Sequence, residues 1–203
     1  PYGGRPFQIW GEFFGVMDNC VIGEMTGTYI TVDGVDAMWK TAGGTFDYGS
    51  ANMFFFEDNL FYGVGGYMTI SSEMSARFCV RHNKFDGAGM TTGCYPLFDA
   101  HGNQPNAHCA TMGVEIYANT VENKYGMEFF DHRGGKALVY NNNVTLYAES
   151  IYTDVREEYN DGCCVAYNPP INTVGQPQHP SDSYYWGNTI NGAQFNPHVA
   201  GTV

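Results

Sequence analysis

The sequence predicts an all-β fold in which short repeated coils stack into a parallel β-helix. Two observations predict it. Asparagines recur inside similar apolar blocks, and a second column of mostly acidic residues follows them at a nearly constant distance. Each repeat is too short to bury its own apolar face, so neighbouring repeats must stack. We therefore expect a single parallel β-helix domain over residues 1–203.

An asparagine holds the sixth position of six similar blocks: FGVMDNCVIG, FFFEDNLFYG, FCVRHNKFDG, VEIYANTVEN, ALVYNNNVTL and SYYWGNTING. These residues are Asn19, Asn59, Asn83, Asn119, Asn142 and Asn188. In a parallel β-helix they would stack at the strand spacing of roughly 4.8 Å, where each amide can bond to the next and to the turn backbone. We expect Asn59, Asn83, Asn119 and Asn142 to be buried at turns.

The second column ends five apolar or β-prone runs, YITVD, YMTIS, YPLFD, MEFFD and SIYTD. Its members are Asp33, Ser71, Asp99, Asp131 and Asp154. One coil therefore consists of a strand, a turn at the asparagine, a second strand, a turn at the acidic residue and a returning segment. The main insertions all follow the acidic column, over residues 35–50, 101–112 and 156–181, and we expect them to touch one another along one edge of the stack.

The composition narrows the function classes. The chain has 26 Gly, 29 Phe plus Tyr and only 15% charged residues, which is typical of a β-rich protein with many turns. A net charge of −12 argues against binding nucleic acid. No apolar run approaches the roughly 20 residues that span a bilayer. The chain begins at Pro1 without a visible signal peptide, so we expect a piece of a longer polypeptide or an assembly.

The blocks VEIYANTVEN, HRGGKALVYNNNV and FDAHGNQ resemble those of right-handed parallel β-helix proteins of the pectate-lyase-like superfamily. The resemblance covers about residues 7–155 and again 183–192. It implies a right-handed parallel β-helix. The six asparagine blocks indicate about six coils, and the insertions indicate long loops on one edge. Members include polysaccharide lyases, polysaccharide hydrolases, phage tail and capsid-surface proteins, and many proteins without assigned activity. The resemblance therefore specifies architecture rather than chemistry.

The acidic column allows three hypotheses. Its carboxylates could cap turns, with His101, Arg133 and Arg156 as surface partners two residues further on. They could instead cleave carbohydrate, since carboxylates about 5 Å apart suit retaining glycosidases and about 9.6 Å apart approach the inverting geometry. The resemblance implies a basic residue as the base of a lyase, for which Arg133 is the candidate. The third hypothesis is a Ca²⁺ site.

The histidines give weaker evidence for a site than the acidic column does. His101 and His108 lie seven residues apart, and His132 is the only further ligand we can suggest. A polar loop with exposed imidazoles explains the same pattern, so we predict no metal site from these residues. Six cysteines leave disulfides and buried thiols equally open.

The inserted loops carry aromatic and amide side chains suited to sugar faces and hydroxyl groups, and equally suited to a protein interface. The predicted binding residues are Trp39, Asn103, Gln104, His108, Arg156 and Tyr159.

The sequence thus favours a non-catalytic extracellular or virion-surface module that contacts polysaccharide or partner proteins through its loop edge, without cofactor other than a possible Ca²⁺. The alternative is a polysaccharide lyase or hydrolase that uses Asp99, Asp131, Asp154, His101 and Arg133. No nucleic acid or membrane partner is expected. At least one end is expected to stack on further coils of a longer polypeptide or on another subunit, including a second copy of this chain, because nothing before Phe7 suggests a cap and FNPHVAGTV offers little cover.

Overall fold

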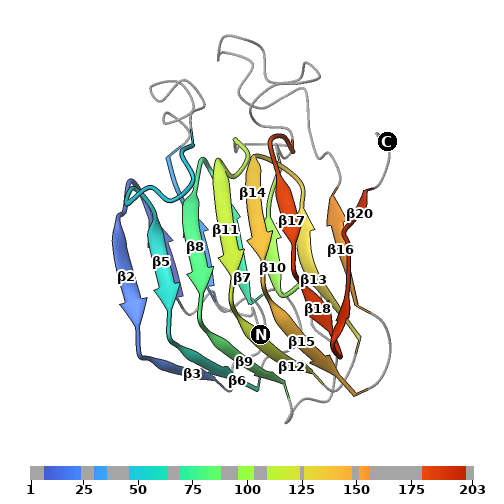
Figure 1. Cartoon of the computed structure of the whole chain (residues 1–203). Coiled ribbons are helices and arrows are strands. Elements are labelled where there is room, and N and C mark those ends of the chain that lie inside the picture. Colours follow the sequence, from blue (N-terminus) through green and yellow to red (C-terminus); the bar gives the residue numbers. More distant parts are fainter. Residues whose placement is uncertain are drawn as a thin grey trace, which may run out of the picture.

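A computed structural model describes residues 7–23, 30–35, 46–63, 69–87, 96–102, 109–123, 126–147, 151–155 and 180–199. Within these ranges every regular element is a β-strand (Figure 1). The strands form three sheets, and chain neighbours fall in different sheets while equivalent strands of successive repeats lie side by side. The prediction of an all-β, parallel β-helix-like solenoid is confirmed.

The sheet that we call sheet A contains, in spatial order, β1 (Phe7–Trp10), β4 (Ile30–Asp33), β7 (Ile70–Glu73), β10 (Phe98–Ala100), β13 (Met127–His132), β16 (Ile151–Val155) and β20 (His198–Val199). Sheet B contains β17 (Tyr184–Trp186), β14 (Lys136–Tyr140), β11 (Gly113–Tyr117), β8 (Arg77–Arg81), β5 (Phe54–Glu57) and β2 (Gly15–Asp18).

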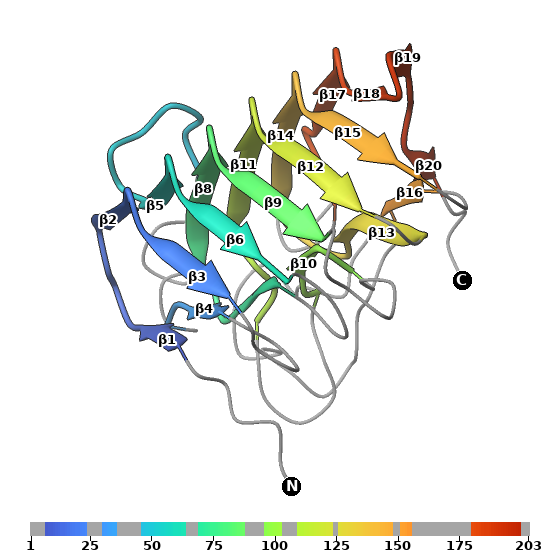
Figure 2. The same cartoon turned by 90° about the horizontal axis from the view of Figure 1, so that it is seen from below.

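Sheet C contains β19 (Ala193–Gln194), β18 (Thr189–Ile190), β15 (Asn143–Leu146), β12 (Thr120–Asn123), β9 (Lys84–Gly87), β6 (Leu60–Tyr62) and β3 (Val21–Gly23). Figure 2 shows these strands side by side in chain order from β3 to β18. The antiparallel pair β18–β19 is the exception to the parallel pairing of the described strands.

The core lies between the three sheets and is filled by alternate residues of each strand. Phe61 and Phe85 of sheet C stack with ring centroids 4.6 Å apart. Phe85 in turn meets Phe98 of sheet A edge-on at 5.1 Å. Aromatic contacts of this kind add to the hydrophobic gain from burying each ring, so they tie the sheets together.

The predicted asparagine ladder is confirmed at five positions. Asn59, Asn83, Asn119, Asn142 and Asn188 are all buried at the corner between sheets B and C. Each side chain from Asn59 to Asn142 donates from Nδ2 to the Oδ1 of the next asparagine, over 2.8–3.1 Å. Each Nδ2 of the five also donates to a strand carbonyl of the preceding coil, as Asn119 does to Val80 at 2.9 Å.

Asn19 does not belong to this ladder, which corrects our alignment by one residue. Strand pairing places Asp18 beside Glu57 and Val21 beside Leu60, so Cys20 holds the position equivalent to Asn59. Asn19 is exposed with φ 51°, in the left-handed region that Asn tolerates. The residue before each ladder asparagine shares this conformation, namely Asp58, His82, Ala118, Asn141 and Gly187. The left-handed residue at each corner is thus the one before the asparagine.

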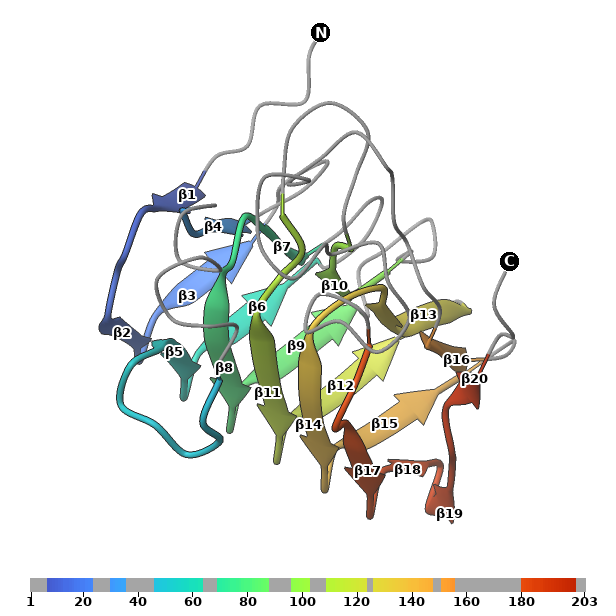
Figure 3. The ribbon, with the colours of Figure 1, turned by 90° about the horizontal axis from the view of Figure 1, so that it is seen from above.

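The C-terminal segment covers more of its end than we expected. Asn191 and Gly192 both have positive φ, as a two-residue type I′ hairpin turn requires, and the chain reverses there into β19. Phe195 then packs edge-on against core residue Phe129 at 5.9 Å, and β20 pairs with β16. Figure 3 shows these elements (red) at one end and β1 to β3 (blue) at the other.

The described ends of the three insertions lie together. Phe46 and Met53 pack with Cys109 and Met112, which joins the first insertion to the second. The Tyr48 hydroxyl donates to the carbonyl of Asp182, directly after the third, at 2.7 Å. The prediction that the insertions share one side is confirmed for these ends, and residues 36–45, 103–108 and 156–179 lie outside the described residues.

Replacing Asn119 with alanine tests the ladder. The change removes two donated bonds and the acceptor for Asn83, so unfolding free energy should fall by about 3 kcal/mol. Asn143→Ala, at the exposed first position of β15, should change it by less than about 0.5 kcal/mol. Denaturant unfolding measures both. Equal losses of unfolding free energy in the two variants would show that the ladder bonds do not stabilise the fold more than an exposed side chain does.

Candidate functional site

The acidic column occupies the outward face of sheet A. Strand pairing aligns Ser71 with Asp99, Asp99 with Asp131, and Asp131 with Asp154. These positions stack as predicted because alternate residues of the same strands, among them Phe98 and Phe130, point into the core.

Asp33 is misplaced in the predicted column. Its partner in β7 is Glu73, and Thr31 is the residue that pairs with Ser71. A two-residue shift leaves every side chain on its own face, so alternation of apolar and polar residues cannot detect it. Asp33 instead accepts a hydrogen bond from Gln8 Nε2 at 2.7 Å.

Arg133 lies between the two central carboxylates. Its Nη2 is 2.7 Å from both Oδ1 and Oδ2 of Asp99, and its Nε is 3.0 Å from Asp131 Oδ2. Asp99 is fully buried, Asp131 and Arg133 nearly so. A buried charge is tolerated only when it is paired, so each of the three groups depends on the others.

His101 completes the cluster. Its Nε2 lies 2.7 Å from Asp99 Oδ2, and its Nδ1 lies 2.6 Å from Arg133 Nη2. Since a guanidinium can only donate and a carboxylate can only accept, Nε2–H donates to Asp99 while Nδ1 accepts from Arg133. Both oxygens of Asp99 are therefore engaged by Arg133, and one also by His101.

This geometry changes the hypothesis that the carboxylates cap turns and pair with cations at the surface. Asp99 and Asp131 lie within β10 and β13 rather than at turns, and their cationic partner is buried rather than at the surface. The reason is that Arg133 follows β13 directly and folds back along the column. The guanidinium supplies the positive charge between the carboxylates that a Ca²⁺ ion would otherwise supply.

Asp154 stands apart from this cluster. It is partly exposed and its Oδ1 lies 3.0 Å from Nδ1 of His198, which is mostly exposed. Among the described residues, no group of three or more His, Cys, Asp or Glu side chains is placed to share a metal ion. The predicted binding residues Trp39, Asn103, Gln104, His108, Arg156 and Tyr159 all lie outside the described residues.

His132, suggested as a metal ligand, is an interior hydrogen-bonding residue. Its ring is fully buried and stacks on Phe130. Nε2 lies 3.1 Å from the Gly135 carbonyl, which can only accept, so Nδ1 accepts from the Tyr185 hydroxyl at 2.8 Å. Burial lowers the pKa of His132 to about 4. The imidazole is therefore neutral and has both nitrogens occupied.

Sequence reasoning missed an aromatic ladder on the outward face of sheet B. Tyr117 and Tyr140 stack at 4.6 Å, and Tyr140 and Trp186 stack at 4.4 Å. Arg81 continues the row, donating to the Tyr117 hydroxyl at 2.9 Å and pairing with Glu57. The signal was present, because each of these residues stands two positions before a ladder asparagine.

The described cysteines differ in state. Cys109 is disulfide-bonded, whereas Cys20 and Cys79 are free. Cys79 is fully buried under Phe46 and Met53, and burial raises the pKa of its thiol to about 12. Since the thiolate is the reactive form, Cys79 is not a nucleophile at neutral pH.

Comparisons with protein-family models, with curated proteins and with solved structures each found no match. The described part of the chain contains no helix of the length and apolarity needed to cross a bilayer. A functional assignment therefore depends on the contacts of the residues themselves.

Arg133→Met tests whether the cluster is a structural unit. The variant buries two carboxylates without their cation, so we expect a loss of about 3–5 kcal/mol in unfolding free energy. Lys136→Met removes a cation paired with exposed Asp182 and should cost less than about 1 kcal/mol. Losses of similar size in both variants, measured by denaturant unfolding, would contradict the structural role.

The buried His132 predicts a pH dependence of stability. Its pKa falls from 6.5 in the unfolded chain to about 4 in the folded protein, so between these values only the unfolded chain takes up the proton. Unfolding free energy should decrease by roughly 3 kcal/mol as the pH is lowered through that window. His132→Gln should flatten this slope, whereas the same slope in variant and wild type would assign it to other groups.

Proposed function

We propose that this protein is a non-catalytic β-helix module that binds polysaccharide at its loop edge, outside the cell or on a virion. The observation that carries the proposal is the closure of Arg133 and His101 on Asp99, with Arg133 also held by Asp131. The proposal includes the resemblance to pectate-lyase-like proteins. It also includes a right-handed winding of the β-helix and a total of about six coils.

The alternative enzymatic use of the column is disfavoured by this closure. A general acid or base must reach the reacting atoms within hydrogen-bond distance. Asp99 is fully buried and directs both oxygens at Arg133, while Arg133 directs Nε and Nη2 at carboxylates. Among the proposed catalytic residues, Asp154 is the one with substantial exposure, and it lies beside His198.

The aromatic ladder supports polysaccharide as the ligand. Trp186 at its end is 45% exposed, and Tyr184, 55% exposed, projects beside it on the same strand. Tyr48 from the first insertion meets Tyr184 edge-on at 6.3 Å. Rigid aromatic rings with polar tips match the alternation of apolar ring faces and hydroxyl groups on a sugar chain. Tyr48 and Tyr184 stand at the loop edge, where the described insertion ends meet, and Trp186 lies two residues further along β17, toward the asparagine corner.

The disulfide at Cys109 supports a location outside the reducing cytosol, because such bonds persist in oxidising compartments. The net charge of −12 adds solubility and opposes nucleic-acid binding.

We also propose that the first coil can associate with a neighbouring subunit. Large apolar side chains are exposed on and next to β1, β2 and β3, namely Phe7, Trp10, Phe13, Phe14, Val16 and Val21. Exposed apolar patches of this kind mark interaction surfaces. Light scattering over a range of protein concentrations tests this association, and a monomer at all concentrations would contradict it.

Binding to a panel of soluble polysaccharides, followed by affinity electrophoresis, tests the main proposal. Trp186→Ala should weaken binding of the retained polysaccharide at least tenfold, because it removes the exposed end of the ladder. Tyr147→Ala, which removes an aromatic side chain that is 70% exposed directly after β15, is the matched control and should bind as the wild type.

Incubation of the same polysaccharides with the protein provides the second readout. We expect no new reducing ends and no unsaturated products. Cleavage that disappears in Asp99→Asn, provided that this variant still folds, would overturn the non-catalytic assignment and favour the lyase or hydrolase.

A further inference from the structure

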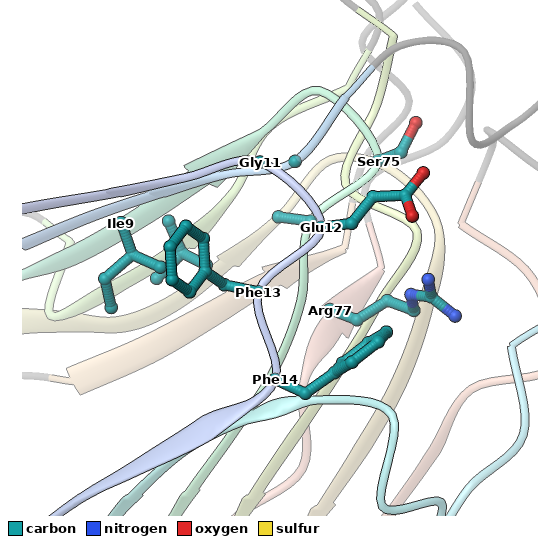
Figure 4. A pocket seen from close by; sticks show the side chains of 10 residues that line it. Ile9, Gly11, Glu12, Phe13, Phe14, Ser75 and Arg77 are labelled. Atoms are coloured by element: carbon teal, nitrogen blue, oxygen red, sulfur yellow. The ribbon is translucent and has the colours of Figure 1, made fainter.

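The hollow beside the first coil is a packing feature and not a ligand site. It lies between the turn at residues 11–14 and residues 75–77, which precede and begin β8 (Figure 4). Its space is about that of one water molecule. The Ser75 hydroxyl on its wall is closed off from solvent, since Ser75 is 1% exposed. A ligand larger than water therefore cannot reach this oxygen.

The turn at residues 46–50 is packed tightly onto the outward face of sheet B, just before the chain enters β5. Phe46 covers Gly113, the first residue of β11, so closely that a Cβ added there would lie 2.5 Å from the Phe46 ring. The turn itself is closed by Ser50, whose amide donates to the Asp47 carbonyl at 3.2 Å. Figure 3 shows this segment (cyan) outside the sheet.

Glu115 lies beneath this turn and is bonded to it. Its neighbours Val114 and Ile116 belong to the core, so its side chain points outward from β11, yet it is 3% exposed. The Gly49 amide donates to Glu115 Oε1 at 2.5 Å. A hydrogen bond to a carboxylate is roughly twice as strong as one between neutral groups. The bond from Gly49 therefore ties the turn to the middle of β11.

Four titratable or charged groups face Glu115, namely Cys79 and Arg81 from β8, Tyr140 from β14 and Tyr48 from the turn. Arg81 is already paired with Glu57. Burial raises the pKa of the Cys79 thiol to about 12 and the pKa of both tyrosines above their ordinary value. These three acids stay protonated at neutral pH, so in this set Glu115 is the group whose charge changes between acidic and neutral pH.

Closure of the turn and protonation of Glu115 are linked. Burial raises the pKa of Glu115, while the Gly49 bond and Arg81 act in the opposite direction. When the turn lifts, water reaches the carboxylate and its pKa returns toward the ordinary value. The closed form thus holds the proton more tightly than the open form. Protonation stabilises closure, and closure weakens as the pH rises through the raised pKa.

The same turn reaches the aromatic surface to which we assign polysaccharide binding. Tyr48 directly precedes Gly49, and its hydroxyl donates to the Asp182 carbonyl at 2.7 Å. Its ring meets Tyr184 edge-on at 6.3 Å. The turn therefore spans from Glu115 on β11 to the start of β17, and a bond that fixes Gly49 also fixes the ring of Tyr48.

We propose that Glu115 is a positioning residue for this surface: it holds the turn at residues 46–50 closed, keeps Tyr48 against Tyr184, and makes polysaccharide binding weaken as the pH rises. The effect on binding rests on the proposed function, whereas the hold on the turn is a property of the chain alone. The two can therefore be measured separately.

The amide resonance of Gly49 reports the hold on the turn. In the wild type its chemical shift should move with pH as Glu115 gains or loses its proton. Glu115→Gln keeps an acceptor and removes the charge, so this movement should disappear while the nuclear Overhauser effect between the rings of Tyr48 and Tyr184 remains. Glu115→Ala removes the acceptor, so the same ring contact should lose most of its intensity.

Titration calorimetry between about pH 5 and about pH 8, with the polysaccharide that the wild type retains, reports the effect on binding. Wild-type affinity should fall as the pH rises, whereas Glu115→Gln should keep the affinity of the acidic wild type throughout. Glu115→Ala should bind about tenfold more weakly at acidic pH, because the turn has lost its bond. His82→Asn is the matched control: it removes another titratable ring, 5.9 Å from that of Tyr117, and should keep the wild-type pH dependence.

Three results would overturn the proposal: an amide shift of Gly49 that still moves with pH in Glu115→Gln, an unchanged ring contact in Glu115→Ala, or the same pH dependence of affinity in Glu115→Gln as in the wild type. If no polysaccharide binds while the amide and ring-contact results are as expected, the polysaccharide function fails and the hold of Glu115 on the turn is supported.

Discussion

The hydrogen-bonded column of buried asparagines is the constraint on which the other features of the structure depend. A buried primary amide must find partners for two donors and one acceptor with two lone pairs. Asn119 satisfies this requirement by binding to the coils on both sides: it donates to Val80 and Asn142 and accepts from Asn83. One side chain thereby ties three successive coils together, and a slip of one coil would leave several buried polar groups unsatisfied.

The fixed corner sets the register of the sheets that leave it. Because β11 pairs with β8 and β14 residue by residue, the position two before each asparagine always faces outward from sheet B. Five residues occupy this position: Glu57, Arg81, Tyr117, Tyr140 and Trp186. Glu57 and Arg81 form an ion pair, Arg81 donates to the Tyr117 hydroxyl, and the three aromatic rings stack on one another. The same repetition on sheet A brings Asp99 beside Asp131 and makes Arg133 necessary between them. The register that stacks the coils therefore also places the aromatic row on sheet B and the charged cluster on sheet A.

Much of this architecture could be predicted from the sequence because it repeats. The asparagine period predicted the solenoid, and the aspartates at 99, 131 and 154 were assigned to neighbouring strands as the structure has them. The errors fell in the first coil. Asp18-Asn19 imitates Asp58-Asn59, yet Cys20 is the residue that meets Asn59, through its amide at 2.9 Å. Asp33 was displaced by two residues, a shift to which a period-two pattern is blind.

The state of the acidic cluster was less predictable for a different reason. Sequence spacing placed Arg133 on the side of the carboxylates, but it could not say whether the guanidinium would close on them or leave them open to a ligand. That choice depends on burial, which is set by every segment that packs over sheet A. The hollow at Ser75 was invisible for the same reason, since it needs Gly34, Ser75 and the turn at 11–14 to meet from three separate coils.

The two ends of the described solenoid differ in how the ladder finishes, and this difference affects how well each end is packed. At the C-terminal end the ladder includes Asn188, the hairpin turn at Asn191 closes sheet C, and Phe195 packs on Phe129. At the other end Cys20 contributes a backbone amide but no side-chain amide, and Ile9 is the one buried apolar residue among the described positions 7–23. Regions with few buried contacts open at the lowest free energy. The first coil is therefore the part of the described solenoid that we expect to open first, whereas the coil of β7 and β8 is held by buried neighbours on both sides.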